Sequence, residues 1–349
     1  MAQAQPLVRS GRFARVAAQS VVGLALMLIA ACVPTVQSAA SPLEGFAGPR
    51  FDVAAERFVS FDGAELGLTA WLPADGEEPR AVIIALHGMN DYANTFYLAG
   101  PWFAAHGVAV YAYDARGFGR SPRRGLWAGE RLMTEDLRTA VRVARRAHPN
   151  AKIVVVGDSM GSATAIATYG SAGAPPIDRL VLVAPAVWGW STLPDHYAFT
   201  LWVGAHTFPW RAVQPPRRVT RRIVASDNRE ALLQAGRAPH MLWTTRIDAV
   251  YGLVSLMETA SQRAANLSGD VLFLYGANDQ IIPRNSAVAT ARRLPASART
   301  ALYENGWHWL LRDLQREVVY QDILAFIEDA HAPFPSGAPP IIPVAQANR

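Results

Sequence analysis

The chain carries the pentapeptide Gly157-Asp158-Ser159-Met160-Gly161, and the sequence on either side of it indicates its structural role. The apolar, β-branched run 151–156 before it predicts a buried strand, and 162–167 after it predicts a helix. A strand, the pattern G-x-S-x-G and a helix together indicate a nucleophile elbow, in which glycines let a sharp turn close around a strained serine. We expect the Ser159 hydroxyl to project from the top of a sheet, although a plain strand-to-helix turn is the alternative.

The rest of the chain alternates apolar strands with helices. Strands are expected at 57–61, 65–72, 81–86, 108–113, 151–156, 179–184, 271–275 and 299–303, and helices at 93–105, 133–148, 162–167 and 318–330. The first two strands predict an antiparallel hairpin around Asp62-Gly63, and we expect Thr134 to cap the helix 133–148. Continuous apolar strands between helices predict a mostly parallel sheet with helices on both faces. The fold class is therefore α/β, with an eight-stranded sheet.

Residues 185–245 interrupt this alternation. They combine five tryptophans (Trp188, Trp190, Trp202, Trp210, Trp243) with arginines that include Arg211, Arg217, Arg218, Arg221 and Arg222, among prolines and glycines. We expect a cap inserted over the sheet between two core segments, 51–184 and 246–331; a loop-rich excursion with its own small core is the alternative. The proline-rich tail, 332–349, is expected to be disordered.

The overall charge does not indicate a nucleic-acid-binding protein. The net charge is +5, but three of the cations lie in residues 1–31, which contain no acid, so the remainder carries +2. Lys152 is the sole lysine, which indicates a compositional bias toward arginine. No helix-turn-helix, zinc-finger or RNA-binding signature accompanies the charge.

The N-terminus has the features of an export signal. Arg9, Arg12 and Arg15 precede an apolar run that extends from residue 16 to 31 and ends at Cys32, the one cysteine of the chain. Ile29-Ala30-Ala31-Cys32 resembles a bacterial lipobox, with Ile where Leu is usual. We therefore expect a signal peptide over 1–31, lipidation of Cys32 and a tether over 32–50 that holds the protein on a membrane of the cell envelope.

Two other fates of the N-terminus stay open. Cleavage after Ala40 would discard Cys32 and release a soluble periplasmic or secreted protein, and retention of the apolar run would leave an uncleaved anchor.

A serine hydroxyl needs a base within hydrogen-bonding distance and a third group that orients the base. We expect His308, after the last strand, to be the base and Asp279, after the strand 271–275, to orient it. Both residues follow the carboxyl ends of strands, where sites form in open parallel sheets. Glu304 and Asp313 are the competing acids.

The other histidines are weaker candidates for the base. His87 follows a strand early in the chain and is expected to brace the neighbouring loop. His106, His148 and His331 fall near helix ends, and His196, His206 and His240 fall within 185–245.

Acyl transfer also needs N–H donors for the developing oxyanion. The backbone N–H groups of Met160 and Met89 are the candidates, the first directly after the serine and the second in the loop after the strand 81–86. The sequence contains no metal-binding cluster and no dinucleotide fingerprint, so we expect no cofactor.

Four stretches resemble the α/β-hydrolase superfamily, in particular its monoacylglycerol lipase and lysophospholipase branch. They are 86–89, 113–121, the Ser159 elbow, and 275–279 with Trp307-His308. The lipase branch often has His where Asp158 stands and Gly where Ser162 stands. The resemblance implies the order serine, acid, histidine along the chain, and a structural role for the motif 114–121.

We therefore expect a serine hydrolase that cleaves carboxylic esters with an apolar acyl chain, through an acyl-enzyme. The partners expected are a small lipid or ester substrate and, through Cys32, a membrane. Acyl transfer to an alcohol and peptidase activity are alternatives on the same residues. A non-catalytic lipid-binding lipoprotein of the envelope and a structural partner protein are alternatives of other classes.

Overall fold

Runs of five to seven residues, mostly apolar, form the central strands, because such runs are stable when both faces of a sheet are covered. The computed structural model describes residues 33–42, 44–74, 77–214 and 223–342. Within these ranges, the main sheet has nine strands: β1 (Arg50–Asp52), β2 (Arg57–Val59), β3 (Glu65–Trp71), β4 (Ala81–Leu86), β5 (Val108–Tyr113), β6 (Lys152–Asp158), β7 (Arg179–Val183), β10 (Val271–Gly276) and β11 (Arg299–Tyr303).

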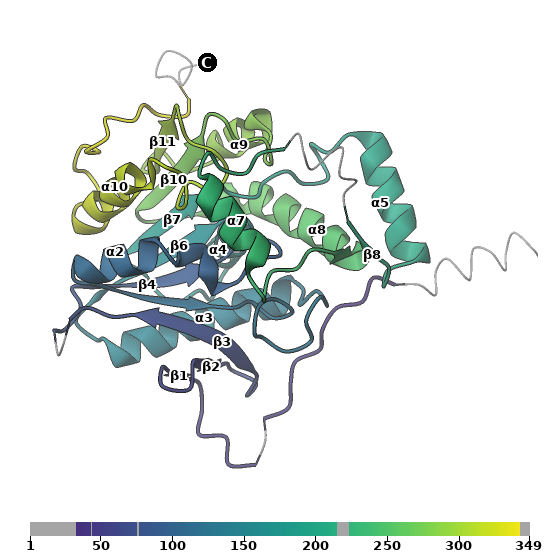
Figure 1. Ribbon diagram of the computed structural model, residues 1–349, viewed down its shortest axis with the longest axis horizontal. Coiled ribbons are helices and arrows are strands. Elements are labelled where there is room, and N and C mark those ends of the chain that lie inside the picture. The colour runs from purple at the N-terminus through teal and green to yellow at the C-terminus, as the bar shows by residue number, and fades with distance from the viewer. Residues whose placement is uncertain (1–32, 43, 75–76, 215–222, 343–349) are drawn as a thin grey trace, which may run out of the picture.

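The strand order is β1-β2-β3-β5-β4-β6-β7-β10-β11 (Figure 1). The pairs from β5 to β11 are parallel, and β1, β2 and β3 add an antiparallel edge next to β5. The carboxyl ends of β4, β6, β10 and β11 therefore lie along one edge of the sheet. The loops that carry Met89, Ser159, Asp279 and His308 leave the sheet there.

Alternate residues of each central strand face two separate apolar clusters. In β4 the even-numbered residues belong to one cluster and the odd-numbered residues to the other. The first cluster includes α3 (Glu130–Ala147), α4 (Met160–Tyr169), α8 (Ile247–Arg263) and α9 (Arg284–Ala291). The second includes α2 (Ala99–Ala105) and α10 (Arg316–Glu328), so both faces of the sheet are covered.

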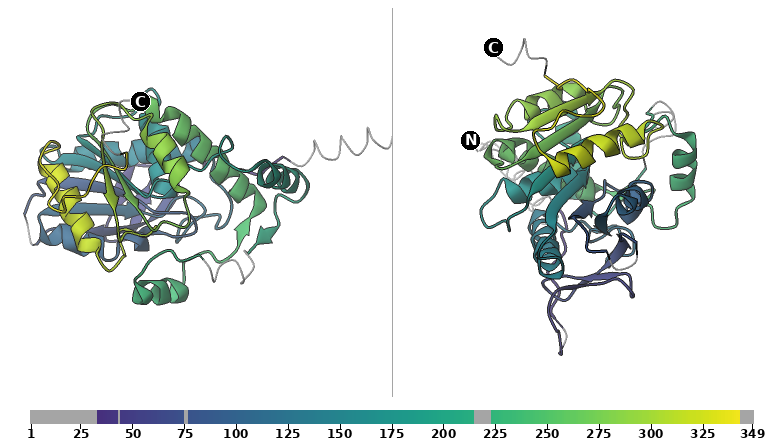
Figure 2. Two further views of the ribbon diagram at one scale, coloured as in Figure 1. Left: turned by 90° about the horizontal axis from the view of Figure 1, so that it is seen from above. Right: turned by 90° about the vertical axis from the view of Figure 1, so that its left-hand side faces the viewer.

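The chain between β7 and β10 contains elements that stand beside the sheet. They are α5 (Asp195–Thr207), β8 (Ala212–Val213), α7 (Arg229–Arg237) and β9 (Thr245–Arg246), and α8 then follows on the covered face of the sheet. β8 and β9 pair antiparallel, and α5 packs against α8. Figures 1 and 2 show α5 at the periphery of the molecule, away from the sheet. None of the helices in the described ranges has the length and hydropathy needed to cross a bilayer.

The strands largely follow the sequence, but the described structure corrects three local predictions. A ninth strand, β1, adds to the eight expected ones at the antiparallel edge. The helix expected over 93–105 is split into the 3₁₀-helix η1 (Ala93–Phe96) and α2, because Pro101 has no N–H to give to residue 97 of a continuous helix. Thr134 does not cap α3, which begins at Glu130 after Gly129; its hydroxyl donates to the Arg131 carbonyl inside the helix.

The described parts of both terminal segments are tied to the core. Gln37, in the segment expected to be a tether, donates from its backbone N–H to Trp127 O (2.9 Å) and from its side chain to Leu126 O (2.6 Å). Ile341, in the tail expected to be disordered, is buried, and its N–H donates to Thr300 Oγ1. The expectation of disorder is therefore wrong for residues 332–342, while the expected signal peptide and Cys32 lie outside the described residues.

Candidate active site

Ser159 lies between β6 and α4 in a strained backbone conformation. Its φ is +51°, a region that residues with a side chain rarely adopt. The turn closes only because of the two glycines of the motif. A Cβ at Gly157 would collide with the Ser162 N–H, and a Cβ at Gly161 would collide with the Leu86 carbonyl of β4. The Ser162 hydroxyl fastens the turn by donating to Gly157 O at 2.6 Å.

The loops after β6, β10 and β11 bring three expected side chains together in one hydrogen-bonded chain. His308 Nε2 lies 3.0 Å from Ser159 Oγ, and His308 Nδ1 lies 2.8 Å from Asp279 Oδ2. Because an ionised carboxylate only accepts, Nδ1 carries the proton and Nε2 is free to accept from the serine. Asp279 is itself fixed, since its Oδ1 accepts the N–H groups of Ile281 (2.8 Å) and Ile282 (3.0 Å).

The electrostatic surroundings of His308 favour its charged form. Burial opposes the imidazolium, but the charge and hydrogen bond of Asp279 outweigh it, so the pKa of His308 lies above its ordinary value. Asp158 acts in the same direction and Arg312 against it. The site therefore stabilises a proton on this histidine.

Neither of the competing acids, Glu304 and Asp313, is hydrogen-bonded to the imidazole of His308. Glu304 is exposed, and Asp313 uses its two oxygens elsewhere, accepting from Ser226 Oγ at 2.6 Å and from Trp307 N–H at 2.7 Å. Burial raises the pKa of Asp313 to about 7, although both donors oppose the shift.

The competing histidines have other partners. His87 Nε2 accepts from the Ala115 N–H at 2.8 Å, and Nδ1 donates to Gly88 O at 2.7 Å, so the buried ring is neutral and braces the loop after β4. His106 and His148 interact with Trp102 O and the Tyr111 hydroxyl, and the ring of His240 packs on Tyr92. His196 and His206 lie on α5, and His331 is exposed after α10.

A brace under the histidine loop was not predicted from the sequence. The short segment 225–228, within the expected insertion, accepts the Trp309 N–H at Ala225 O and supplies Ser226 to Asp313. Asn228 donates from its side chain to Arg312 O at 2.8 Å and also caps α7. The run of small polar residues before a helix was the available signal, but its distant partner is visible only in the fold.

Charged groups are buried beside the nucleophile as well. Arg312 is 2% exposed, pairs with Asp91 at 2.8 Å and stacks on the ring of Trp309. Asp158, directly before the serine, is also buried, and this burial raises its pKa to about 6 against the opposing effect of Arg312 and His308.

The motif 114–121 has a structural role in the described chain. Asp114 accepts from the N–H groups of Ala93 and Arg120, and Arg116 pairs with Asp62 and Asp136 in a buried network. These contacts join the antiparallel edge of the sheet to α3.

The two candidate oxyanion donors flank the serine. Met160 is the first residue of α4, so its N–H has no acceptor within the helix. Met89 follows Gly88, and the Gly88 backbone lies so close to the serine that a Cβ there would be 3.4 Å from Ser159 Cβ. Met89 and Ser159 line the same cavity.

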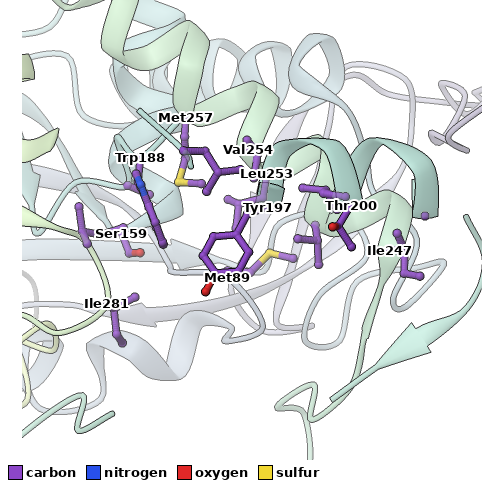
Figure 3. Close-up of a pocket in the computed structure, with 16 residues that line it drawn as sticks. Met89, Ser159, Trp188, Tyr197, Thr200, Ile247, Leu253, Val254, Met257 and Ile281 are labelled. Carbon is purple, nitrogen blue, oxygen red and sulfur yellow. The ribbon is translucent and has the colours of Figure 1, made fainter. Parts of the chain in front are cut away.

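This cavity has a volume of about 630 Å³ and lies between α5 and α8. Figure 3 shows Ser159 at one end of it, beside Trp188 and Ile281, with side chains of α5 and α8 projecting into the space beyond. Its lining is almost wholly apolar and contains no charged side chain: Met89, Ser159, Ala186, Trp188, Leu193, Tyr197, Thr200, Leu201, Gly204, Ile247, Val250, Leu253, Val254, Met257, Ile281 and Ile282. In the part of the chain that the structure describes, no group of three or more His, Cys, Asp or Glu side chains could hold a metal ion.

Comparison with known proteins shows the family of the chain. A family model described as serine aminopeptidase, S33 (Hydrolase_4) matches residues 77–315, more than half of the chain. A monoacylglycerol lipase of Mycolicibacterium smegmatis is 26% identical over 276 residues, which are 77% of this chain and 95% of the relative.

Solved structures share the fold at low sequence identity. A soluble variant of the monoglyceride lipase of Saccharomyces cerevisiae, in complex with a substrate analogue, aligns with a TM-score of 0.67 at 16% identity, covering 84% of this chain and 100% of the other. A thermostable carboxyl esterase of Bacillus coagulans aligns with a TM-score of 0.64 at 20% identity, covering 78% and 96%. The chain belongs to the Hydrolase_4 family and is an α/β-hydrolase similar to monoacylglycerol lipases.

Proposed function

We propose that this protein hydrolyses carboxylic esters with an apolar acyl chain, of the monoacylglycerol or lysophospholipid kind, through an acyl-enzyme. One observation carries the proposal: the hydrogen-bonded chain from Asp279 through His308 to Ser159 ends at an uncharged, apolar cavity. A reactive hydroxyl suits acyl transfer, and the lining suits a hydrocarbon chain.

In the first half of the reaction, Ser159 Oγ attacks the ester carbonyl while its proton passes to His308 Nε2. Asp279 holds the Nδ1 tautomer and stabilises the imidazolium that forms. The imidazolium then gives this proton to the leaving alcohol as the C–O bond breaks, and the acyl group remains on Ser159.

In the second half, His308 takes a proton from water, whose oxygen attacks the acyl carbon, and the same proton returns to Ser159 as the carboxylic acid leaves. The negative oxygen of each tetrahedral intermediate is bound by the N–H groups of Met89 and Met160. The position of Met160 at the start of α4 supports this role, because a helix N-terminus favours negative charge.

The cavity distinguishes this proposal from an aminopeptidase. An aminopeptidase must hold the charged amino group of its substrate, and charged groups are seldom buried without a partner. The cavity lining contains no carboxylate, so it fits an acyl chain better than a peptide N-terminus.

We also propose, from the sequence, that the segment 185–245 acts as the cap of this site and that Cys32 is lipidated, which would hold the enzyme at a membrane of the cell envelope. Mass spectrometry of the mature N-terminus tests the second point. A mature chain that begins with a diacylated Cys32 is expected, and an unmodified chain that begins at Ser41 would overturn it.

The experiment for the function is a series of 4-nitrophenyl esters and monoacylglycerols of increasing chain length, hydrolysed by the protein and by Ser159→Ala. We expect kcat/KM to rise with chain length and to vanish in the variant. Hydrolysis of amino-acid anilides but not of esters would favour a peptidase, and product formation only with added alcohol would favour an acyltransferase. No turnover by folded protein would favour a lipid-binding role.

A further inference from the structure

The proposed oxyanion donor Met89 is the second residue of a tight turn, 88–91. The turn is closed by the Asp91 N–H, which donates to the Gly88 carbonyl at 3.3 Å. Asn90, the third residue of the turn, has a φ of +65°, whereas Met89 does not have a positive φ. This combination is that of a type II turn, which requires glycine or asparagine at its third position. The turn therefore depends on a residue 90 that accepts the left-handed conformation.

The turn sets the direction in which the Met89 N–H points. A trans peptide unit is planar, so the Gly88 carbonyl and the Met89 N–H, which belong to one unit, point in opposite directions. The carbonyl accepts from the Asp91 N–H and also from His87 Nδ1, at 2.7 Å. No described residue accepts from the Met89 N–H itself. Two hydrogen bonds thus hold the carbonyl side of this peptide unit and direct its N–H to the other side, toward a ligand.

Asn90 joins the turn to the stretch of chain just before α8. Its Nδ2 donates to Thr245 Oγ1 at 2.8 Å, and its carbonyl accepts the Leu242 N–H at 2.9 Å. Arg124 holds the same stretch by donating to Met241 O at 2.9 Å. Residue 90 is therefore fixed by a segment 155 positions away as well as by its own tolerance of a positive φ.

The Asn90 side chain also has an unfavourable feature. Its Oδ1 is buried and has no hydrogen-bond partner within the described chain. A buried unpaired oxygen lowers the free energy of unfolding, and glycine would adopt the same backbone conformation without it. What the Nδ2 group holds in place therefore explains this asparagine better than stability does.

We propose that Asn90 is a positioning residue for acyl transfer, which holds the turn 88–91 so that the Met89 N–H binds the oxyanion. This role rests on the proposed function. Asn90 does not line the cavity with Met89 and Ser159, so it acts through the turn (Figure 3). The Gly88 backbone lies against the nucleophile, because a Cβ there would be 3.4 Å from Ser159 Cβ. A change of conformation at residue 90 therefore moves the donor relative to the reacting carbon.

The first test separates the conformation of residue 90 from its side-chain bond. Asn90→Ala disfavours the positive φ and removes the amide, whereas Asn90→Gly removes the amide but keeps the conformation accessible. With a soluble short-chain ester, we expect kcat to fall about 10²-fold in Asn90→Ala, a loss typical of one oxyanion donor. Asn90→Gly should lose about fivefold, the equivalent of one hydrogen bond. KM should stay within about twofold, because the oxyanion forms in both halves of the reaction but not in the bound ester.

The side-chain bond is tested on its partner. Thr245→Val removes the hydroxyl that accepts from Asn90 and keeps a similar side-chain shape. The expected loss in kcat is about fivefold, like that of Asn90→Gly. The matched control is Thr244→Val, at the exposed neighbouring threonine, which should leave kcat unchanged.

A transition-state analogue separates positioning from general damage to the fold. A trifluoromethyl ketone with a short alkyl chain adds to the Ser159 hydroxyl and forms a tetrahedral adduct with a negative oxygen. In Asn90→Ala its inhibition constant should rise by about the factor by which kcat/KM falls. The inhibition constant of the matching alkyl ether, which forms no oxyanion, should not change. The thermal midpoint of unfolding, measured alongside, shows which variants are folded.

Two outcomes with active native protein would overturn the proposal. One is a kcat of folded Asn90→Ala that equals the native value. The other is an equal loss of affinity for the ketone and the ether, which would indicate a distorted cavity. Should Asn90→Ala fail to fold, native kcat in both Asn90→Gly and Thr245→Val would overturn the proposal in the same way. If the native protein hydrolysed no ester, the proposed function would fail, and this role with it.

Discussion

The edge of the sheet around Ser159 and the helix α5 border the same cavity but are held in opposite ways. Around Ser159 the side chains are buried and every polar group of the chain Asp279–His308–Ser159 has a partner within 3.0 Å. By contrast, α5 has a single buried residue and apolar side chains on both sides.

The proposed function accounts for this difference. Chemistry needs donors and acceptors fixed before the substrate arrives, so the reacting groups are held by several loops at once. An apolar chain needs room and an entrance, which a weakly held helix provides at the cost of exposed apolar surface. Changes at the sheet edge should therefore lower the rate by orders of magnitude, whereas changes on α5 should alter substrate choice.

The largest effect is expected from Ser159→Ala. Removing the nucleophile should lower kcat for a soluble ester about 10⁶-fold while leaving the fold intact. The check is kcat together with the thermal midpoint of unfolding. A variant that keeps more than a small fraction of the activity would show that another residue is the nucleophile.

The second effect is expected from Asp279→Asn. The wrong imidazole tautomer and the loss of charge should lower kcat/KM about 10³–10⁴-fold. Activity requires neutral His308, whose pKa Asp279 raises, so in the native protein kcat/KM should climb with pH through a value above 6.5. In the variant, this rise of kcat/KM with pH should occur at lower pH.

A matched control for the acid is Glu304→Gln, which changes the exposed competitor on the next loop. It should leave unchanged both kcat/KM and the pH range over which kcat/KM rises. If Glu304→Gln and Asp279→Asn had equal effects, the assignment of the orienting acid would be wrong.

On the side of α5, Gly204→Leu should change chain-length preference rather than the chemistry. A side chain at 204 would enter the cavity beside Ile247, whose Cγ2 lies 3.3 Å from the position of a Cβ there. We expect kcat/KM for long-chain esters to fall about tenfold and that for a short ester to stay nearly constant.

The matched control is Gly236→Leu on α7, where an added Cβ meets no described atom within 4 Å. It should leave the profile of kcat/KM against chain length as it is. An equal loss for short and long esters in Gly204→Leu would mean that α5 is part of the rigid catalytic edge.

The smallest effect concerns stability at the catalytic edge. Burial raises the pKa of Asp158 from 3.8 to about 6, so the folded protein binds this proton up to a higher pH than the unfolded chain. The free energy of unfolding should therefore fall as pH rises from about 4 to about 6. In Asp158→Asn this fall should shrink by up to about 3 kcal/mol.

The measurement for Asp158 is the urea midpoint across this pH range. Burial also raises the pKa of Asp313 to about 7, so this residue adds a fall between about pH 4 and about pH 7 that both proteins share and that serves as the internal reference. A steeper fall in the variant would contradict the assignment of the buried proton to Asp158.

The sequence predicted those parts of the fold and of the site that depend on a local residue pattern. Apolar runs predicted the central strands, and the glycines at 157 and 161 predicted the turn that presents Ser159. Asp279 and His308 could be chosen because polar residues after parallel strands meet at one edge.

The features that the sequence did not predict depend on contacts between segments that are far apart in the chain. Thr134 looked like a helix cap, but the helix begins earlier, at Glu130, after Gly129 with its positive φ and with no side-chain cap. The brace of Asp313 by Ser226 joins residues 87 positions apart. The terminal segments fold onto the core through Gln37 and Ile341, and single hydrogen bonds of this kind leave no periodic pattern in a sequence.

The decisive measurement is the covalent labelling of the native protein with a fluorophosphonate, followed by peptide mass spectrometry. Ser159, activated by His308, should carry the phosphonyl group stoichiometrically, and Asp279→Asn should react far more slowly. Folded protein that remains unlabelled, or that is labelled at another residue, would contradict the account.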